Sequence, residues 1–341
     1  MSATGATTRA DAAVAAAPAE RAGTPAWQRA LLVAAGVAAA LAPLWVLESF
    51  HLFQLTMAVI MALAVLGLNI VTGYNGQISL GHGAFFAVGA YVTAILMSHL
   101  DWSFWATLPV SAVVCTALGW GVGFPALRLG GLYLALTTFA LAVAVPQLLK
   151  HRALEDWTGG VQGLFLVKPD PPAFLPVTPD QWMYLVAVGI SAVLFLLAWN
   201  LIRGRIGRAL MATRDHPTAA EAMGMDIAQL KTRAFAVSAM ITGIAGSLSA
   251  VAVEFVAPDS FTLFVSITLF VGMVAGGVAS ILGSLFGGLF VLFVPNIAES
   301  ISKAAPGVIY GVILIAFLFL LPDGFAGLLR RVAARLRAGR G

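Results

Sequence analysis

The sequence has few charged residues and almost no cysteine. Lys, Arg, Asp and Glu make up 10% of its 341 residues, whereas a soluble domain has about a quarter. A single cysteine, Cys115, excludes a disulfide framework and a metal site built from several cysteines within the chain. Hydrophobic residues make up 60% of the chain, and the mean hydropathy is +0.95. The composition is that of a polytopic membrane protein.

Motifs for catalysis and for nucleotide binding are also missing. No Gly-x-x-x-x-Gly-Lys-Ser/Thr phosphate-binding loop occurs, because none of the lysines, at positions 150, 168, 231 and 303, follows the required glycines. The sequence shows no metal-ligand spacing, and a formal net charge of +4 does not indicate nucleic-acid binding. We therefore predict a protein that is not an enzyme, holds no cofactor itself and has the lipid bilayer as its surroundings.

Long apolar runs predict an all-α membrane domain over residues 27–325. Spans of about 20 residues each give about ten transmembrane helices. Residues 53–97 allow an alternative, a span followed by a broken or re-entrant piece. The Ala-, Thr- and Pro-rich residues 1–26 are predicted to be a disordered tail, and residues 326–341 a basic tail. The predicted spans cover about 30–46, 53–71, 78–97, 106–124, 132–149, 183–201, 234–253, 263–282, 286–301 and 307–321.

The distribution of Lys and Arg predicts the orientation of the chain. These residues concentrate in the loop 203–233 and in the C-terminal tail, so both segments are expected in the cytoplasm. Four predicted spans separate them, an even number, which agrees with this placement. Counting back places Arg128 inside, the connection 150–181 outside, and the N-terminus in the cytoplasm together with the C-terminus.

The stretch 73–91 is too polar for a lipid-facing helix. It contains five glycines together with Gln77, Ser79 and His82. Unsatisfied polar groups in lipid cost several kcal/mol each, so protein or a water-filled cavity must cover the stretch. Glycine-interrupted segments at membrane depth indicate a transport site, although glycines also let helices pack closely. The candidates for a translocation pathway are Gln77, Ser79, Gly81, His82 and Gly83.

His82 allows two interpretations. An ionisable residue within a membrane span suggests a proton relay. No carboxylate lies deep in any predicted span, however, because Glu254, Asp259 and Glu299 fall near predicted span ends. We therefore expect His82 to be neutral and hydrogen-bonded.

The basic loop 203–233 contains a short predicted helix from Pro217 to Met223. Asp215 is a candidate N-cap, Pro217 suits the first turn, and Gly224 suits the position after the helix end. A helix of about two turns is not stable alone in water, so it must dock. It rests either on lipid headgroups or on another protein. The candidate coupling residues are Arg214, Asp215, Ala220, Glu221, Ala222 and Gly224.

These motifs resemble those of one transporter family. The run Gly-Tyr-Asn-Gly-Gln-Ile-Ser-Leu-Gly-His-Gly-Ala-Phe-Phe from Gly73 is similar to the signature of LivM-type permease subunits of branched-chain amino-acid ABC importers. Ala220-Glu221-Ala222-Met223-Gly224 is similar to a shortened Glu-Ala-Ala-x-x-x-Gly loop of ABC importer permeases. The run from Gly130 to Phe139 resembles a further family segment and adds Tyr133 and Thr137 to the pathway candidates. Thr158-Gly159-Gly160 resembles the family's outer loop. Ala279 and Ser284 depart from the family's Gly-Gly-x-Gly-Ser-x-x-Gly-Pro run, which leaves a local helix break there open.

The resemblance implies a role in import across the bacterial inner membrane. It implies a pair with a homologous LivH-type permease, two ATPase subunits that bind ATP, and a periplasmic substrate-binding protein. The short helix in loop 203–233 would then couple the permease to the ATPase. The implied cargo is branched-chain amino acids, with urea, short amides or aromatic acids as alternatives. An ion-coupled secondary transporter is a further alternative, but it needs buried ionisable residues, which are scarce.

Overall fold

The computed structural model describes residues 38, 40–126, 131–173, 175–301, 303 and 306–338. The chain divides into two units, Met1–Leu47 and Glu48–Gly341. In the first unit, the described residues include the short helix α3, Pro43–Val46. The predicted tail 1–26, most of the predicted span 30–46, and Arg128 lie outside the described residues.

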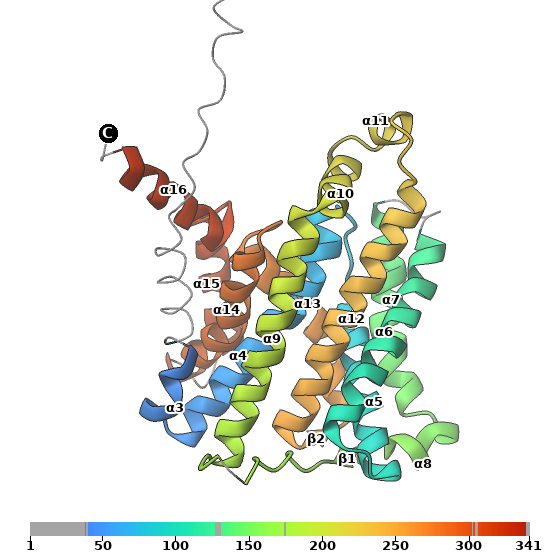
Figure 1. The fold of residues 1–341 in the computed structure, drawn as a ribbon, viewed down its shortest axis with the longest axis vertical. Helices are drawn as coiled ribbons and strands as arrows, with labels where there is room; N and C mark the ends of the chain where they lie inside the picture. Colours follow the sequence, from blue (N-terminus) through green and yellow to red (C-terminus); the bar gives the residue numbers. More distant parts are fainter. Residues whose placement is uncertain are drawn as a thin grey trace, which may run out of the picture. The chain divides into compact units, whose positions relative to one another are not determined.

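The second unit is built from helices with a few short connections (Figure 1). Its first half contains α4 (Ser49–Leu68), the π-helix η1 (Asn69–Tyr74), α5 (His82–Leu100), α6 (Phe104–Ala126), α7 (Leu132–Leu149), η2 (Arg152–Leu154), α8 (Glu155–Thr158), β1 (Leu164–Phe165) and α9 (Pro179–Arg203). The second half contains α10 (Arg205–Asp215), α11 (Pro217–Ala222), α12 (Ile227–Val253), β2 (Phe255–Val256), η3 (Pro258–Phe261), α13 (Leu263–Gly276), α14 (Ile281–Ile301), α15 (Pro306–Leu320) and α16 (Gly324–Ala338).

Among the described residues, six helices are long and apolar enough to cross a membrane. They are Ser49–Tyr74, His82–Leu100, Phe104–Phe124, Pro179–Arg203, Ile227–Val253 and Ile281–Ile301. The bent pair formed by Tyr133–Leu149 and Arg152–Thr158 gives a seventh if it is one span. Two further apolar helices, Leu263–Gly276 and Gly307–Phe317, are shorter. The prediction of an all-helical polytopic protein is confirmed, whereas the described residues provide fewer full-length spans than the ten predicted.

Two predicted span boundaries are wrong. The span predicted to start at residue 78 begins at His82, because residues 76–81 are not helical. The span predicted over 263–282 ends at Gly276. Gly277 then has φ +122° and Ala279 has φ +55°, values that a right-handed helix excludes, so α14 starts afresh at Ile281.

Helix α12 is the central element of the second unit, packed against α4, α5 and α6. The packing against α5 is close because glycines remove side chains from the contact. A Cβ atom on Gly89 would lie 1.9 Å from the carbonyl oxygen of Gly243, and one on Gly246 would lie 1.9 Å from that of Phe86. Small residues allow such close approach between membrane helices. At Gly89 the close-packing interpretation of the glycine stretch is therefore correct.

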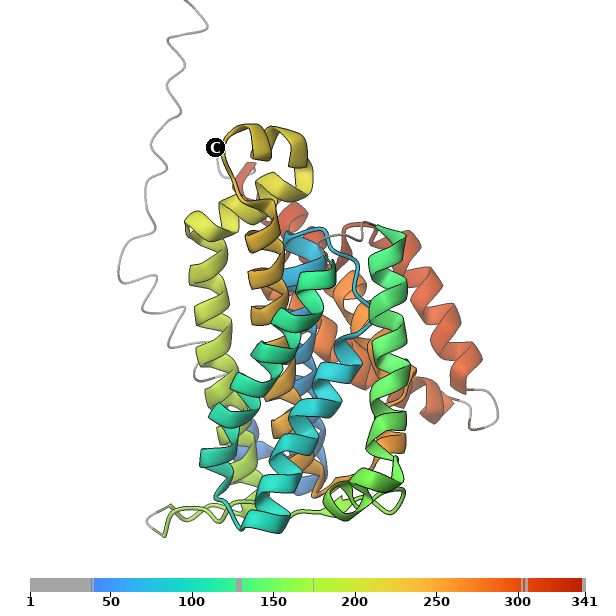
Figure 2. The same ribbon diagram turned by 90° about the vertical axis from the view of Figure 1, so that its right-hand side faces the viewer.

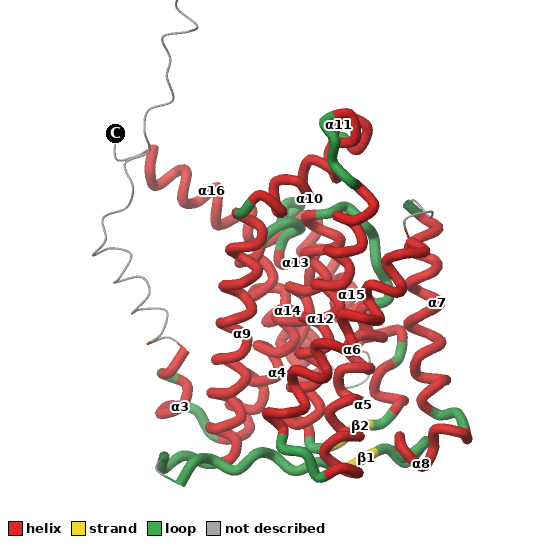
Figure 3. The backbone as a smooth tube through the Cα atoms, turned by 45° about the vertical axis from the view of Figure 1, so that its right-hand side comes forward, coloured by secondary structure: helices red, strands yellow, loops and turns green. Residues whose placement is uncertain are grey.

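The long connections lie at opposite ends of the second unit. Helices α10, α11 and α16 lie at one end, whereas α8, β1, β2 and the connection that leads into α9 lie at the other (Figures 1, 2 and 3). The charge pattern predicted this relative arrangement, with loop 203–233 and the C-terminal tail on the same side. Helix α16 begins at Gly324 and runs through Ala338, so it includes most of the predicted tail 326–341.

The end that carries β1 and β2 is cross-linked by backbone and ionic contacts. The two strands pair antiparallel, with Leu164 opposite Val256. The Lys168 ammonium lies 2.9 Å from the Asp180 carboxylate and 3.3 Å from that of Glu254. Burial lowers the pKa of Lys168, but the hydrogen bonds and charges of these two carboxylates outweigh it and leave the pKa raised. The connection into α9 is thus fixed to the turn after α12.

The α5–α12 contact gives a stability prediction with a matched control. Gly89→Leu places a side chain where Gly243 lies and should prevent recovery of folded, monodisperse protein after detergent extraction. Gly121→Leu should be tolerated, because nothing lies within 4 Å of a Cβ at Gly121. Size-exclusion profiles of the two variants measure the difference. Equal recovery of both variants would contradict close packing at Gly89.

Candidate functional site

The chain leaves helical geometry between η1 and α5, at residues 75–81. Two backbone N–H groups, one in this break and one in the following turn, donate hydrogen bonds to side chains of other helices. Leu80 N–H donates to Thr138 Oγ1 at 3.0 Å, and Gly83 N–H donates to Ser266 Oγ at 2.9 Å. Donors at a helix break need such partners wherever water is excluded. Helices α7 and α13 therefore hold the start of α5 in place.

His82 lies in a fully buried chain of hydrogen bonds. The Ser238 hydroxyl donates to Gly67 O at 2.6 Å, so it accepts at its oxygen from His82 Nε2, 2.5 Å away. His82 Nδ1 then accepts from the Ser79 hydroxyl at 2.9 Å. A neutral imidazole carries one donor and one acceptor nitrogen, and this network uses both. The geometry fits the expected neutral, hydrogen-bonded histidine.

The two segments selected from the sequence, 73–91 and 203–233, contact each other. Arg214 of α10 donates from Nη1 to Gly73 O at 2.8 Å, at the end of η1. Thr213 Oγ1 lies 3.4 Å from Asn75 Oδ1. Gln77 Nε2 donates to the carbonyl oxygen of Lys231, in the first turns of α12, at 3.3 Å. Loop 203–233 therefore contacts the break and the end of η1 from both sides, through α10 and through the first turns of α12.

The absence of a side chain at Gly76 allows Arg214 to lie against the break. The φ of Gly76 is +72°, and a Cβ atom there would lie 2.7 Å from Arg214 Cγ. Glycine adopts positive φ without strain, and its missing side chain leaves room for the arginine stem. The charge-assisted hydrogen bond to Gly73 O, in the last turn of η1, is one of the stronger kinds found in proteins.

A second break, between α13 and α14, is held by Asn69 of η1. The Asn69 carboxamide donates to Ser280 O and to Ser284 Oγ, both at 3.0 Å, and accepts from Ala279 N–H at 2.9 Å. A local break is thus present although the residues differ from the family run, and the Ser284 hydroxyl is one of its contacts. The buried Asn69 side chain therefore joins η1, which leads into the glycine stretch 73–91, to the segment between α13 and α14.

The short helix of loop 203–233 is present as α11, Pro217–Ala222. The predicted N-cap, Asp215, is wrong: α10 continues through Asp215, and His216 occupies the N-cap position without a side-chain hydrogen bond. Asp215 accepts from Arg214 Nε at 2.8 Å, and this bond lowers the pKa of its carboxyl group. Gly224 has φ +80°, which confirms the conformation predicted for it.

The coupling candidates differ in exposure. Ala220 is buried, whereas Glu221, Ala222 and Gly224 are exposed. Met223, between them, is also exposed. Arg214 is exposed as well, but its guanidinium also donates to Gly73 O of η1. The exposed residues of α11 are thus available to a partner, whereas Arg214 of α10 links the same loop to η1.

The pathway candidates do not form one cluster. Gln77, Ser79, Gly81, His82 and Gly83 are buried together around the start of α5. Tyr133 is exposed, and Thr137 donates to the carbonyl oxygen of Tyr133 one turn earlier. That is the common role of threonine in membrane helices. The neighbouring Thr138 contacts the break instead. Gly130, the first residue of that predicted motif, lies outside the described residues.

Four polar residues that hold the site were not selected from the sequence. Asn69, Ser238 and Ser266 lie inside predicted spans, and Asn75 lies within the glycine stretch. A polar residue within an apolar run is the signal that could have identified them, since such residues find partners inside the bundle. Within the described residues, no group of three His, Cys, Asp or Glu side chains could hold a metal ion.

The helices are apolar enough to cross a membrane. Polar side chains from other helices hold the two described breaks. These features define a polytopic membrane protein with discontinuous helices. Residues 50–321 match the family described as branched-chain amino acid transport system, permease component. The chain belongs to this family. Its members are transport permeases rather than enzymes.

Relatives within the family include both permease types. The chain is 33% identical over 249 residues to the LivM permease protein of Escherichia coli K12, covering 66% of this chain and 58% of that protein. It is 26% identical over 300 residues to the LivH permease protein of the same strain, covering 78% and 91%. It is 24% identical to BraD of Pseudomonas aeruginosa, covering 82% and 97%. The chain thus spans less than two thirds of the LivM relatives' length.

The histidine network predicts the effect of removing one hydroxyl. Ser238→Ala removes one of the bonds to Gly67 O, which keeps that from Asn69 N–H, and leaves His82 Nε2 without its acceptor. An unsatisfied buried group costs about 1–3 kcal/mol. The purified protein should unfold at a lower temperature than the wild type in a thermal-shift assay. Ser300→Ala, at an exposed hydroxyl, is the control and should not change the midpoint. Identical midpoints for both variants would contradict the network.

Proposed function

We propose that the chain is a LivM-type permease subunit of an ATP-driven importer in the bacterial inner membrane. It forms the translocation pathway with a homologous LivH-type permease and passes branched-chain amino acids delivered by a periplasmic binding protein. The observation that carries this proposal is the Arg214–Gly73 hydrogen bond, because it joins the basic loop to the break in the glycine stretch. Membership of the permease family supports it.

The proposal places ATP on partner subunits. The chain has no phosphate-binding loop, so two separate ATPase subunits bind and hydrolyse ATP and this chain holds no cofactor. The end with α10, α11 and α16 faces the cytoplasm, because it carries the basic loop and tail. In this proposal about ten spans cross the membrane and both termini are cytoplasmic. The connection 150–181 faces the binding protein outside.

The geometry of loop 203–233 supports a role in coupling. In the proposal, the exposed residues Glu221, Ala222 and Gly224 dock in a cleft of the ATPase, and small residues allow close contact there. Helix α10 transmits the displacement to η1 through Arg214. The break at 75–81 lies at membrane depth and moves with it. The buried residues Gln77, Ser79, Gly81, His82 and Gly83 then shift beneath the surface that the chain presents to the pathway.

The cargo assignment needs its own experiment. The assembled importer, reconstituted in proteoliposomes with ATP inside and loaded binding protein outside, should take up radiolabelled leucine, isoleucine or valine. Uptake of urea, short amides or aromatic acids in preference to these would overturn the assignment of cargo but keep the mechanism. ATP-independent uptake by the chain alone would overturn the mechanism itself.

Gly224 provides a test of the coupling loop. Gly224→Val introduces a β-branched residue at positive φ, where only strain opposes it because nothing lies within 4 Å of a Cβ there. The variant should insert normally but lose ATPase subunits, or lose the stimulation of ATP hydrolysis by loaded binding protein. Gly224→Asn is the matched control, because asparagine tolerates this conformation. Stimulated hydrolysis by Gly224→Val at the wild-type rate would exclude this loop as the transmission element.

Arg214 provides a test of the link between loop and break. Arg214→Gln shortens the side chain and removes the charged bond to Gly73 O, worth about 1.5–3 kcal/mol. ATP hydrolysis should continue while uptake per ATP hydrolysed falls several-fold. Arg205→Gln makes the same charge change at an exposed position of the same helix and should keep the wild-type ratio. A loss of equal size in both variants would mean that only loop charge matters.

A further inference from the structure

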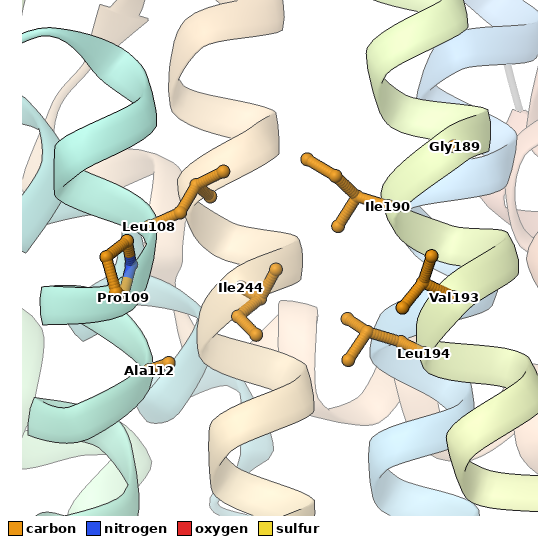
Figure 4. Close-up of a pocket in the computed structure, with 8 residues that line it drawn as sticks. All are labelled: Leu108, Pro109, Ala112, Gly189, Ile190, Val193, Leu194 and Ile244. Carbon is orange, nitrogen blue, oxygen red and sulfur yellow. The ribbon is translucent and has the colours of Figure 1, made fainter.

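A groove lies between α6 and α9, over α12. Leu108 and Pro109 of α6 form one wall, Ile190 and Val193 of α9 form the other, and Ile244 of α12 forms the floor (Figure 4). Its volume is about 300 Å³. The side chains that line it are all nonpolar. Both wall helices are candidate membrane spans, so the groove opens toward hydrocarbon rather than water.

Gly189 keeps the groove open on the α9 side. It lines the groove, and a Cβ atom placed on it would meet nothing within 4 Å. The glycine therefore differs from Gly89 and Gly246, which are needed for helix contact. It leaves space that another molecule can fill, and a larger side chain there would occupy the groove without displacing its neighbours.

A second cavity lies along α12, toward the end that carries α10 and α11. Its volume is about 340 Å³, and Trp120 and Phe124 of α6 face Gln229 and Arg233 of α12 across it. Arg233 is exposed and donates from Nη2 to Gln229 Oε1 at 2.7 Å. In the described part of the chain, no carboxylate lies within ion-pair distance of Arg233. The cavity thus has aromatic walls and a cation without a charged partner.

The two cavities lie along one face of α12. Arg233 and Ile244 are separated by 11 residues, which is close to three helical turns and about 16 Å of rise. Val237 and Met240 lie between them and are partly buried. One leaflet of hydrocarbon is about 15 Å deep, half of a core of about 30 Å. The face therefore runs from a basic, aromatic edge to an apolar groove about one leaflet deeper.

We propose that this face binds one anionic phospholipid from the leaflet on the side of α10 and α11. Its phosphate contacts the Arg233 guanidinium, which offers a planar fork of donors suited to phosphate oxygens. Trp120 lies at the headgroup level, where tryptophan is enriched. One acyl chain follows Val237 and Met240 and ends in the groove beside Gly189. Basic pockets between spans on the cytoplasmic side are suited to anionic headgroups.

The occupant is a lipid rather than a helix of another subunit because of charge and size. A helix with its side chains is about 10 Å across, whereas an acyl chain is narrow enough for a groove of about 300 Å³. A phosphate headgroup also neutralises the Arg233 guanidinium, which an apolar helix would not do. The lipid would fill the space between α6 and α9, and α9 continues directly into α10. The inference goes beyond the proposed transport role and uses it only to assign the cytoplasmic leaflet.

Native mass spectrometry of the full chain, purified in mild detergent with the subunits that accompany it, tests the proposal. The probes are phosphatidylglycerol and phosphatidylcholine of identical acyl chains. We expect one retained phosphatidylglycerol per chain. Gly189→Leu should lower its retention at least about fivefold, whereas Gly311→Leu, another helical glycine with no atom within 4 Å of a Cβ, should not. Arg233→Gln should reduce the preference for phosphatidylglycerol about fivefold, the factor for about 1 kcal/mol per basic residue.

Equal lipid retention in the wild type, Gly189→Leu and Gly311→Leu would overturn the groove as the site of the acyl chain. An unchanged lipid preference in Arg233→Gln would overturn the headgroup contact. A Gly189→Cys variant that cross-links to another protein subunit, instead of to a photoreactive phosphatidylglycerol, would show that a helix fills the groove. None of these readouts requires transport, so failure of the importer assignment would leave the lipid result interpretable.

Discussion

Backbone polar groups that leave a helix inside an apolar bundle must find partners within the protein. An unsatisfied group in hydrocarbon costs several kcal/mol, and the described residues include helix breaks at 75–81 and at 277–280. Side chains from distant helices meet this requirement at both. Asn69 binds the second break through both ends of its carboxamide, and Arg214 binds the carbonyl before the first. The arrangement of α4, α5, α13 and α14 depends on these contacts.

Because distant helices satisfy the first break, movements of the break and of these helices are coupled. The residues that satisfy the first break come from α7, α10 and α13, so the break cannot shift independently of them. Arg214 and Asn69 act on the two ends of η1, and η1 therefore connects the basic loop to both breaks. A displacement of α10 must either move η1 or break a charge-assisted hydrogen bond. In the proposed importer, this connection transmits a displacement of the loop to the glycine stretch.

The sequence identified features that depend on local chemistry. Apolar runs located the helices, and Gly224 was correctly assigned a positive φ because a helix end requires it locally. Asp215 was misassigned as an N-cap because nothing in its neighbourhood indicated that α10 would continue through it. The span 263–282 was drawn through Gly277 because its composition is apolar throughout, although its backbone turns.

Long-range partners could not be derived from a single sequence. Ser238 is 171 positions from Gly67, and Asn69 is 215 positions from Ser284, so no periodicity joins them. Thr137 and Thr138 are adjacent and chemically equal, and only the position of α7 beside the break decides that Thr138 contacts it. The connection between the two predicted segments, 73–91 and 203–233, is for the same reason a finding of the structure.

The central claim is that loop 203–233 and the first break move as one body. Asn75→Cys and Thr213→Cys, in a chain whose single native cysteine is replaced by Cys115→Ala, place two thiols where Asn75 Oδ1 and Thr213 Oγ1 lie 3.4 Å apart. Uptake by the reconstituted importer is then measured before and after a short cross-link joins them. Unchanged ATP-driven uptake in the cross-linked protein is the predicted result. Uptake that stops on cross-linking and returns on reduction would show that the loop and the break separate during transport, and would contradict the account.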